Sequence, residues 1–142
     1  MSTPIRLLLP RQLLAEMIAH AQAELPNECC GLLAGTIATD GIARIQRRYS
    51  LVNALASPTE YESDPKSMFD AVRNMRTLGI DIVAVYHSHP TSEPVPSRKD
   101  RERNYLGEVV HFIVGLNGKE PDTRGWCLNA DTHAEAAWEI IG

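Results

Sequence analysis

An apolar run from Ile80 to His87, closed by His89 and Pro90, constrains the fold more than any other part of the chain. Such a run is typical of a strand buried on both faces at the centre of a sheet. Side chains alternate along a strand, so His87 and His89 are expected on one face and Ser88 on the other. Pro90 favours an extended conformation at His89 and ends the strand. The sequence therefore predicts two imidazoles held at one rigid strand end, where both can bind one metal ion.

A third ligand candidate follows a loop stiffened by Pro94 and Pro96. Ser97 has the character of a helix N-cap, which places Asp100 in the first turn of a short helix. A catalytic zinc takes three protein ligands and keeps one position for water, and Asp100 is the candidate for the third ligand. Ser97 and Asp100 also fit a variant of the capping box, in which each side chain binds the backbone of the other. Asp100 cannot serve both purposes with one oxygen.

Helical and strand patterns alternate along the first half of the chain, and strands dominate the second half. Asp64 and Pro65 mark the start of a helix, and Gly79 marks its end. Residues 53–63 show no period and are expected to be irregular. The tail over 132–141 is open between a helix and an edge strand. The remaining periodic segments predict helices over 11–24 and 64–79 and strands over 5–9, 29–35, 42–52, 80–87, 109–116 and 124–130.

This order predicts an α/β fold with a mixed central β-sheet packed with helices. A chain of 142 residues is the usual size of one domain, so we expect a single domain over 1–142. Strict alternation in the strand over 42–52 would put Ile45 and Tyr49 on one face, with Arg44, Gln46 and Arg48 on the other.

The charge, the apolar runs and the cysteine content of the chain limit the partners and the cellular location that we expect. The net charge is −4 and the lysines and arginines are scattered, so we expect no nucleic-acid partner. The apolar runs are too short to span a membrane or to form the core of a signal peptide. Cys29, Cys30 and Cys127 make an odd number of cysteines, which disfavours a disulfide framework and favours a reducing cytoplasm. Nothing in the sequence indicates a homo-oligomer, and the oligomeric state stays open.

The sequence His-Ser-His-Pro at 87–90, six further residues, and then Ser97-x-x-Asp100 resembles the metal-binding signature of the JAMM (MPN-plus) zinc metalloproteases. Members of this family cleave isopeptide or peptide bonds next to ubiquitin-like proteins. The other half of their signature is a glutamate before a Cys-Gly-Leu-Leu-x-Gly strand, which Glu28 and the segment 29–35 resemble. The length and element order are similar to those of compact prokaryotic members, whose fold is cytidine-deaminase-like.

The resemblance implies one Zn²⁺ per chain, bound by His87, His89 and Asp100 together with a water. Glu28 would be the general acid and base that takes a proton from this water and returns it to the leaving amine. Ser97 would stabilise the oxyanion of the tetrahedral intermediate. The implied reaction is zinc-dependent hydrolysis at the C-terminal tail of a ubiquitin-like or sulfur-carrier protein. Whether an isopeptide bond, a linear peptide bond or a single amino acid is released stays open.

Two other functions stay open at this point. A non-catalytic MPN-type scaffold would bind protein partners through the same fold. A cupin-like metal-binding protein would use His87 and His89 with Glu93 and His111, but the flanking glycines of that motif are absent and Pro94 directly follows the glutamate. A histidine within an apolar strand is usually structural, and we expect this of His111. The three cysteines are expected to be small buried apolar residues.

Overall fold

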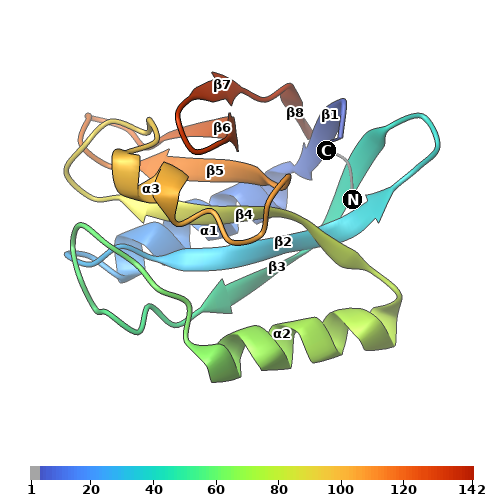
Figure 1. The fold of residues 1–142 in the computed structure, drawn as a ribbon, viewed down its shortest axis with the longest axis horizontal. Helices are drawn as coiled ribbons and strands as arrows, with labels where there is room; N and C mark the ends of the chain where they lie inside the picture. Colours follow the sequence, from blue (N-terminus) through green and yellow to red (C-terminus); the bar gives the residue numbers. More distant parts are fainter. Residues whose placement is uncertain (1–3) are drawn as a thin grey trace.

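An eight-stranded sheet in the order β7-β6-β5-β4-β2-β3-β1-β8 forms the centre of the computed structural model (Figure 1). The structure describes residues 4–142, so the first three residues of the expected 1–142 domain lie outside it. The strands are β1 (Arg6–Pro10), β2 (Cys30–Ile37), β3 (Ile42–Leu51), β4 (Asp81–His89), β5 (Val110–Gly115), β6 (Asp122–Leu128), β7 (His133–Glu135) and β8 (Trp138–Ile141). The helices are α1 (Arg11–Ala23), α2 (Pro65–Leu78) and α3 (Arg98–Glu102).

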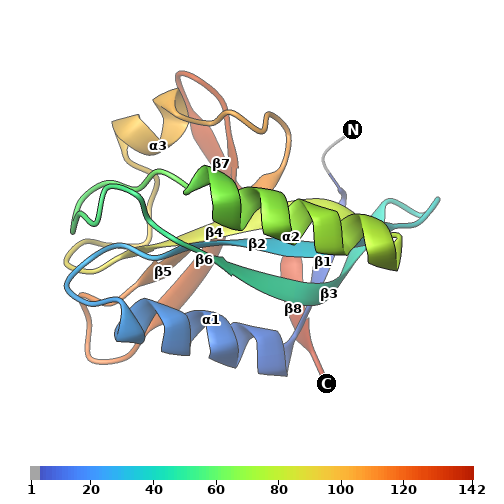
Figure 2. The same cartoon turned by 90° about the horizontal axis from the view of Figure 1, so that it is seen from below.

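The helices cover both faces of the sheet. Figure 2 shows α1 on one face and α2 with α3 on the other. Met17 and Ala21 of α1 pack in a buried cluster with Leu33 and Phe112, whereas Met75 of α2 belongs to a second cluster on the opposite face. The sheet is mixed, because β1 pairs in parallel with β3 and β8, and β4 with β5, while the other pairs are antiparallel. The predicted α/β fold is confirmed.

The boundaries of α2 are set by the caps that the sequence indicated. The Asp64 side chain accepts a hydrogen bond from the Ser67 N–H at 3.0 Å, and Pro65 is the first residue of α2. Gly79 ends α2 with φ 69°, the left-handed conformation that glycine adopts readily. No helix within residues 4–142 combines the length and the apolar character needed to cross a lipid bilayer.

The tail that the sequence left ambiguous is extended. β8 pairs with β1, and β7 pairs with β6, so the tail supplies both outer strands of the sheet. The segment 53–63 is irregular as expected and is closed at its base by an isolated bridge between Asn53 and Ser63.

The expectation that Ile45 and Tyr49 share one face of β3 is wrong. Gln46 has no residue opposite it in β2, so it is the extra residue of a β-bulge, which reverses the alternation of side chains beyond it. Ile45 therefore packs in the cluster with α1. Tyr49 lies on the other face and its hydroxyl donates to Asn74 Oδ1 of α2 at 2.5 Å. Arg48 turns towards α1 and its guanidinium donates to the Tyr86 hydroxyl at 2.9 Å.

Gly31 generates a stability prediction. A Cβ placed on Gly31 would lie 2.2 Å from Cε1 of the buried Tyr86 ring. Since the ring is held by its neighbours, we expect Gly31→Ala to lower the free energy of unfolding by about 1–3 kcal/mol, as overpacking of a core does. Urea denaturation measures the change. Gly118→Ala is the control, because its nearest contact would be an ordinary 3.6 Å. An equal effect of both substitutions would contradict the prediction.

Candidate metal centre

Three side chains form a compact group of nitrogen and oxygen atoms at the end of β4. His87 Nε2 and His89 Nε2 are 3.2 Å apart. Asp100 Oδ1 lies 3.2 Å from His87 Nε2, and Asp100 Oδ2 lies 3.1 Å from His89 Nε2. Both histidines are buried and point to the same face, as the alternation of strand side chains predicted. The structure therefore brings together the three ligands expected from the sequence.

The dimensions of this group suit zinc. Ligand atoms about 2.0–2.2 Å from a tetrahedral zinc ion are about 3.4 Å from one another. The three separations of 3.1–3.2 Å are close to this value, and two imidazoles with a carboxylate are a common donor set for zinc. The residues present therefore fit a zinc ion with a further position open.

Contacts around the histidines orient their rings. His89 Nδ1 lies 2.7 Å from the backbone carbonyl of Glu93, which can only accept a hydrogen bond, so Nδ1 donates and Nε2 keeps its lone pair for a metal. The His87 ring is stacked with the Tyr61 ring at a centroid separation of 4.7 Å. Among the described residues, His87 Nδ1 has no hydrogen-bond partner. Packing by Tyr61 therefore takes the place of a polar contact at His87.

The proline-rich loop between β4 and α3 is fixed to the sheet. The Trp126 indole N–H donates to the Pro94 carbonyl at 2.9 Å. The Pro94 ring lies so close to Gly115 that a Cβ there would be 2.7 Å from its Cδ. This loop is anchored by β5 and β6, so it holds α3 against the end of β4.

The two oxygens of Asp100 have different partners. The Ser97 N–H donates to Asp100 Oδ2 at 2.9 Å, and Asp100 N–H donates to Ser97 Oγ at 3.2 Å, which completes the capping box. Oδ1 faces His87 and is not used by the cap. The capping box and metal binding are therefore compatible, because each can use its own oxygen.

Neighbouring groups shift the pKa values of Asp100 and His89 in opposite directions. Burial acts to raise the pKa of Asp100, but the His87 and His89 rings and the Ser97 N–H outweigh it and lower this pKa well below its usual range. Burial acts to lower the pKa of His89, but the hydrogen bonds to Asp100 and to the Glu93 carbonyl raise it. The carboxylate is thus held ionised, as a metal ligand must be.

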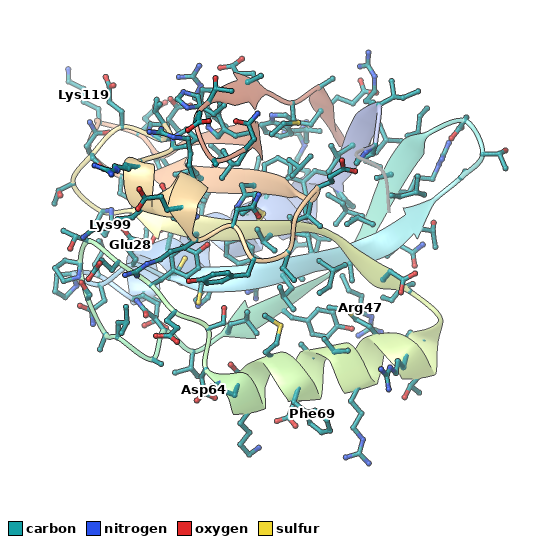
Figure 3. The ribbon with its side chains drawn as sticks, in the orientation of Figure 1. Glu28, Arg47, Asp64, Phe69, Lys99 and Lys119 are labelled. Carbon is teal, nitrogen blue, oxygen red and sulfur yellow. The ribbon has the colours of Figure 1, made fainter. Side chains whose placement is uncertain are left out.

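Glu28 lies beside this group without belonging to it. In the antiparallel pairing of β2 with β4, Cys30 is opposite His87, and Glu28 precedes Cys30 by two residues. Glu28 is 5% exposed, and within the described chain the ligand group does not include it. Burial raises its pKa to about 7, although the charges of His87 and His89 act in the opposite direction. Figure 3 shows Glu28 at the same end of the molecule as Lys99 of α3.

Ser97 lies at the start of α3 and is exposed. Its Oγ accepts the hydrogen bond from Asp100 N–H, so the hydroxyl hydrogen is free to donate to another oxygen. This arrangement allows Ser97 to cap the helix and to contact a ligand at the same time.

A cavity of about 520 Å³ lies next to the group. One wall comes from the segment 53–63, the other from α3 and the connection that follows it, and the floor from β2 and β4. Tyr105 and Leu106, on the second wall, are exposed apolar side chains. The cavity therefore offers a space with both apolar and charged walls beside Asp100.

The residues of the cupin-like alternative are used differently. Glu93 contributes its backbone carbonyl to His89, and the mixed sheet with helices on both faces is unlike an all-β barrel. His111 Nε2 lies 3.0 Å from Asn104 Oδ1, outside the ligand group among the described residues. Burial lowers the pKa of His111 to about 4. His111 is therefore a structural histidine, as expected, and the cupin-like alternative is wrong.

The sequence did not single out the contacts made by the segment 53–63. Tyr61 packs on His87, and Glu60 pairs with Lys99 at 2.8 Å and with Arg103 at 3.5 Å. These contacts join an irregular segment to α3. A lone tyrosine or glutamate in a stretch without periodicity carries no local signal of such contacts, so only the folded structure identifies them.

Comparisons with known proteins agree with this geometry. The sequence profile of the prokaryotic homologues of the JAB domain matches residues 10–129. A desampylase from Haloferax volcanii is 35% identical over 123 residues, which cover 82% of this chain and 86% of the relative. A probable TtuB-protein conjugate cleaving protease from Thermus thermophilus is 35% identical over 114 residues, covering 79% and 72% of the two chains.

Two further similarities concern a peptidase and a solved structure. A CysO-cysteine peptidase from Mycobacterium tuberculosis is 37% identical over 94 residues, which are 66% of this chain and 62% of the relative. The solution structure of a protein from Desulfitobacterium hafniense superposes with a TM-score of 0.86 at 30% identity, covering 95% of this chain and 92% of the other.

The buried carboxyl of Glu28 generates a pH prediction for the zinc-free protein. Between about pH 4.5 and 7 the folded protein keeps a proton on Glu28 that the unfolded chain releases, so stability falls as the pH rises through this range. Glu28→Gln removes this penalty. At pH 8 we expect the variant to be more stable than the wild type by about 1–3 kcal/mol, and at pH 4.5 the two should differ little.

Urea denaturation with a chelator present, at both pH values, measures this difference. Glu120→Gln, at an exposed position, is the control and should change nothing at either pH. A Glu28→Gln variant less stable than the wild type at pH 8 would show that the buried carboxylate is stabilising.

Proposed function

We infer the function from one premise: this chain belongs to the family of prokaryotic homologues of the JAB domain. Its relatives include a desampylase, a conjugate cleaving protease and a CysO-cysteine peptidase. The chain is accordingly a peptidase of the JAMM type. The alternative of a non-catalytic scaffold is not favoured, because every ligand that the reaction needs is present at one place.

We propose that His87, His89 and Asp100 hold one zinc ion per chain. The spacing of their donor atoms and the ionised state of Asp100 support this assignment. When bound, zinc lowers the pKa of water to about 7 and polarises a carbonyl group.

Glu28 is proposed as the general base and then the general acid. A carboxyl with a pKa of about 7 is matched to neutral pH, because it can both take a proton from the attacking water and return it to the leaving nitrogen. Its exclusion from the ligand group supports this role, since a ligating carboxylate could not move a proton in the same way. Ser97 is proposed to donate its hydroxyl hydrogen to the carbonyl oxygen as negative charge develops there.

The substrate proposed is a ubiquitin-like or sulfur-carrier protein, cleaved at its C-terminal tail. The names of the relatives, which describe a desampylase, a cleaving protease for TtuB conjugates and a peptidase for CysO-cysteine, support this class. The cavity beside the ligands supplies space for the residues next to the scissile bond. The free cysteines Cys29, Cys30 and Cys127 support the proposal that the protein works in the cytoplasm.

One observation carries the proposal: Glu28, whose carboxyl has a pKa raised to about 7, lies beside the group of three candidate ligands without belonging to it. We expect Glu28→Gln to lower kcat by about 10²–10⁴-fold, the usual contribution of a general acid–base group, while zinc content stays near one per chain. His89→Ala should lose zinc and activity together. The exposed Glu120→Gln is the matched control for Glu28→Gln.

The assay uses carrier proteins encoded in the same genome, each with either a single amino acid or a lysine side chain joined to its C-terminal carbon. Product masses distinguish release of one amino acid from isopeptide cleavage. Zinc-loaded protein that cleaves neither substrate would contradict the proposed function.

Ser97 caps α3 and is proposed to contact the oxyanion, and measurements of stability and of kcat report on these two roles separately. Ser97→Ala removes both the cap and the hydroxyl, so we expect a loss of about 1 kcal/mol in stability and of about 10²-fold in kcat. Ser97→Thr keeps both groups and should retain most of the stability and activity. Urea denaturation and steady-state kinetics measure the two effects. A Ser97→Ala variant with unchanged kcat would exclude the oxyanion role.

A further inference from the structure

The segment 53–63 connects β3 to α2 without regular structure, yet its hydrogen bonds converge on one side chain. The Asn53 Nδ2 group donates to the backbone carbonyls of Glu28 at 3.1 Å and Glu60 at 3.0 Å. Asn53 Oδ1 accepts from the backbone N–H groups of Leu55 and Glu62, both at 3.1 Å. Both donors and both acceptor positions of the carboxamide are therefore used.

We propose that Asn53 is a positioning residue, which fixes the backbone of Glu28 and so the place of its carboxyl beside the metal ligands. This inference rests on the proposed function of Glu28 and goes beyond it. Glu28 precedes the first residue of β2, so the strand ladder does not hold its backbone. Its carbonyl is bound by Asn53, and its N–H donates to the Ser57 carbonyl at 2.8 Å. Both backbone polar groups of Glu28 are thus held by the segment that Asn53 organises.

The same carboxamide acts on the metal side of the site. It binds the backbone of Glu60 and Glu62, on either side of Tyr61, whose ring packs on His87. The Glu60 carboxylate in turn pairs with Lys99 of α3. Asn53 is therefore the point at which the supports of Glu28 and of a proposed zinc ligand meet.

The geometry predicts which substitution is informative. Asn53→Asp has nearly the same shape and keeps the acceptor for the Leu55 and Glu62 N–H groups. It replaces the donating amide by an oxygen that faces the Glu28 and Glu60 carbonyls, so two hydrogen bonds are lost and repulsion takes their place. Asn53→Ala removes all four hydrogen bonds. Catalysis is sensitive to such changes, because displacing a reacting group by about 1 Å can lower the rate by about 10²-fold.

The experiment compares both Asn53 variants with matched variants of Asn129. Asn129 also closes a turn with its side chain, accepting from the N–H groups of Asp131 and Thr132, but it lies between β6 and β7. We expect the zinc-loaded Asn53 variants to lower kcat by about 10–100-fold, to shift the acidic limb of the pH–kcat profile, and to leave KM within about threefold. The Asn129 variants should match the wild type in all three quantities. A loss confined to stability would show a structural role only.

Amide hydrogen exchange gives a readout that does not depend on activity. In zinc-free Asn53→Ala, the Glu28 N–H should exchange at least about tenfold faster, while the Ser88 N–H, which donates to the Cys29 carbonyl, should not change. If wild-type protein cleaves no substrate, the proposed function fails, and exchange at Glu28 still decides whether Asn53 positions it. If Asn53→Ala does not fold, the same measurements on Asn53→Asp decide whether Asn53 positions Glu28. Folded Asn53 variants whose kcat, pH profile and amide exchange at Glu28 all equal those of the wild type would overturn the inference.

Discussion

The contact between the Asp100 carboxylate and the two imidazoles is the interaction on which the rest of the structure depends. A buried carboxylate is costly unless it is paired and hydrogen-bonded, and His87, His89 and the Ser97 N–H supply these partners. The contact also joins α3 to the end of β4, so the proline-rich loop between them must follow one path. The central strand, the loop and the short helix form one unit because their ends meet at this group.

A second unit completes the site from the opposite side. β2 is the antiparallel neighbour of β4, and this pairing brings Glu28 to the ligands although about sixty residues separate them in the chain. The segment 53–63 then holds Glu28 by its backbone and covers His87 with Tyr61. The candidate metal ligands therefore come from local chain geometry, whereas the proposed proton-transfer group depends on the tertiary fold.

Sequence reasoning succeeded where the signal is local. Alternation placed His87 and His89 on one face, and capping chemistry located Asp64, Gly79 and Ser97. It failed where the signal is not local. The bulge at Gln46 depends on the register of β3 against β2, so strict alternation gave Tyr49 the wrong face. The tail shows no clear period, because β7 and β8 are edge strands with little buried surface, and their pairing partners decide their structure. The hydrogen bonds of Asn53 likewise join segments whose proximity no sequence window contains.

The indole of Trp126 has a use that its structural role does not suggest. Its N–H is bonded to the Pro94 carbonyl within the loop that leads from His89 to Ser97, and the ring is almost fully buried. Indole emission is sensitive to hydrogen bonding and to solvent polarity, so a change in the path of this loop changes the light that the protein emits. The molecule therefore carries an optical reporter of the loop that joins His89 to Asp100, built from a residue outside the candidate ligand group.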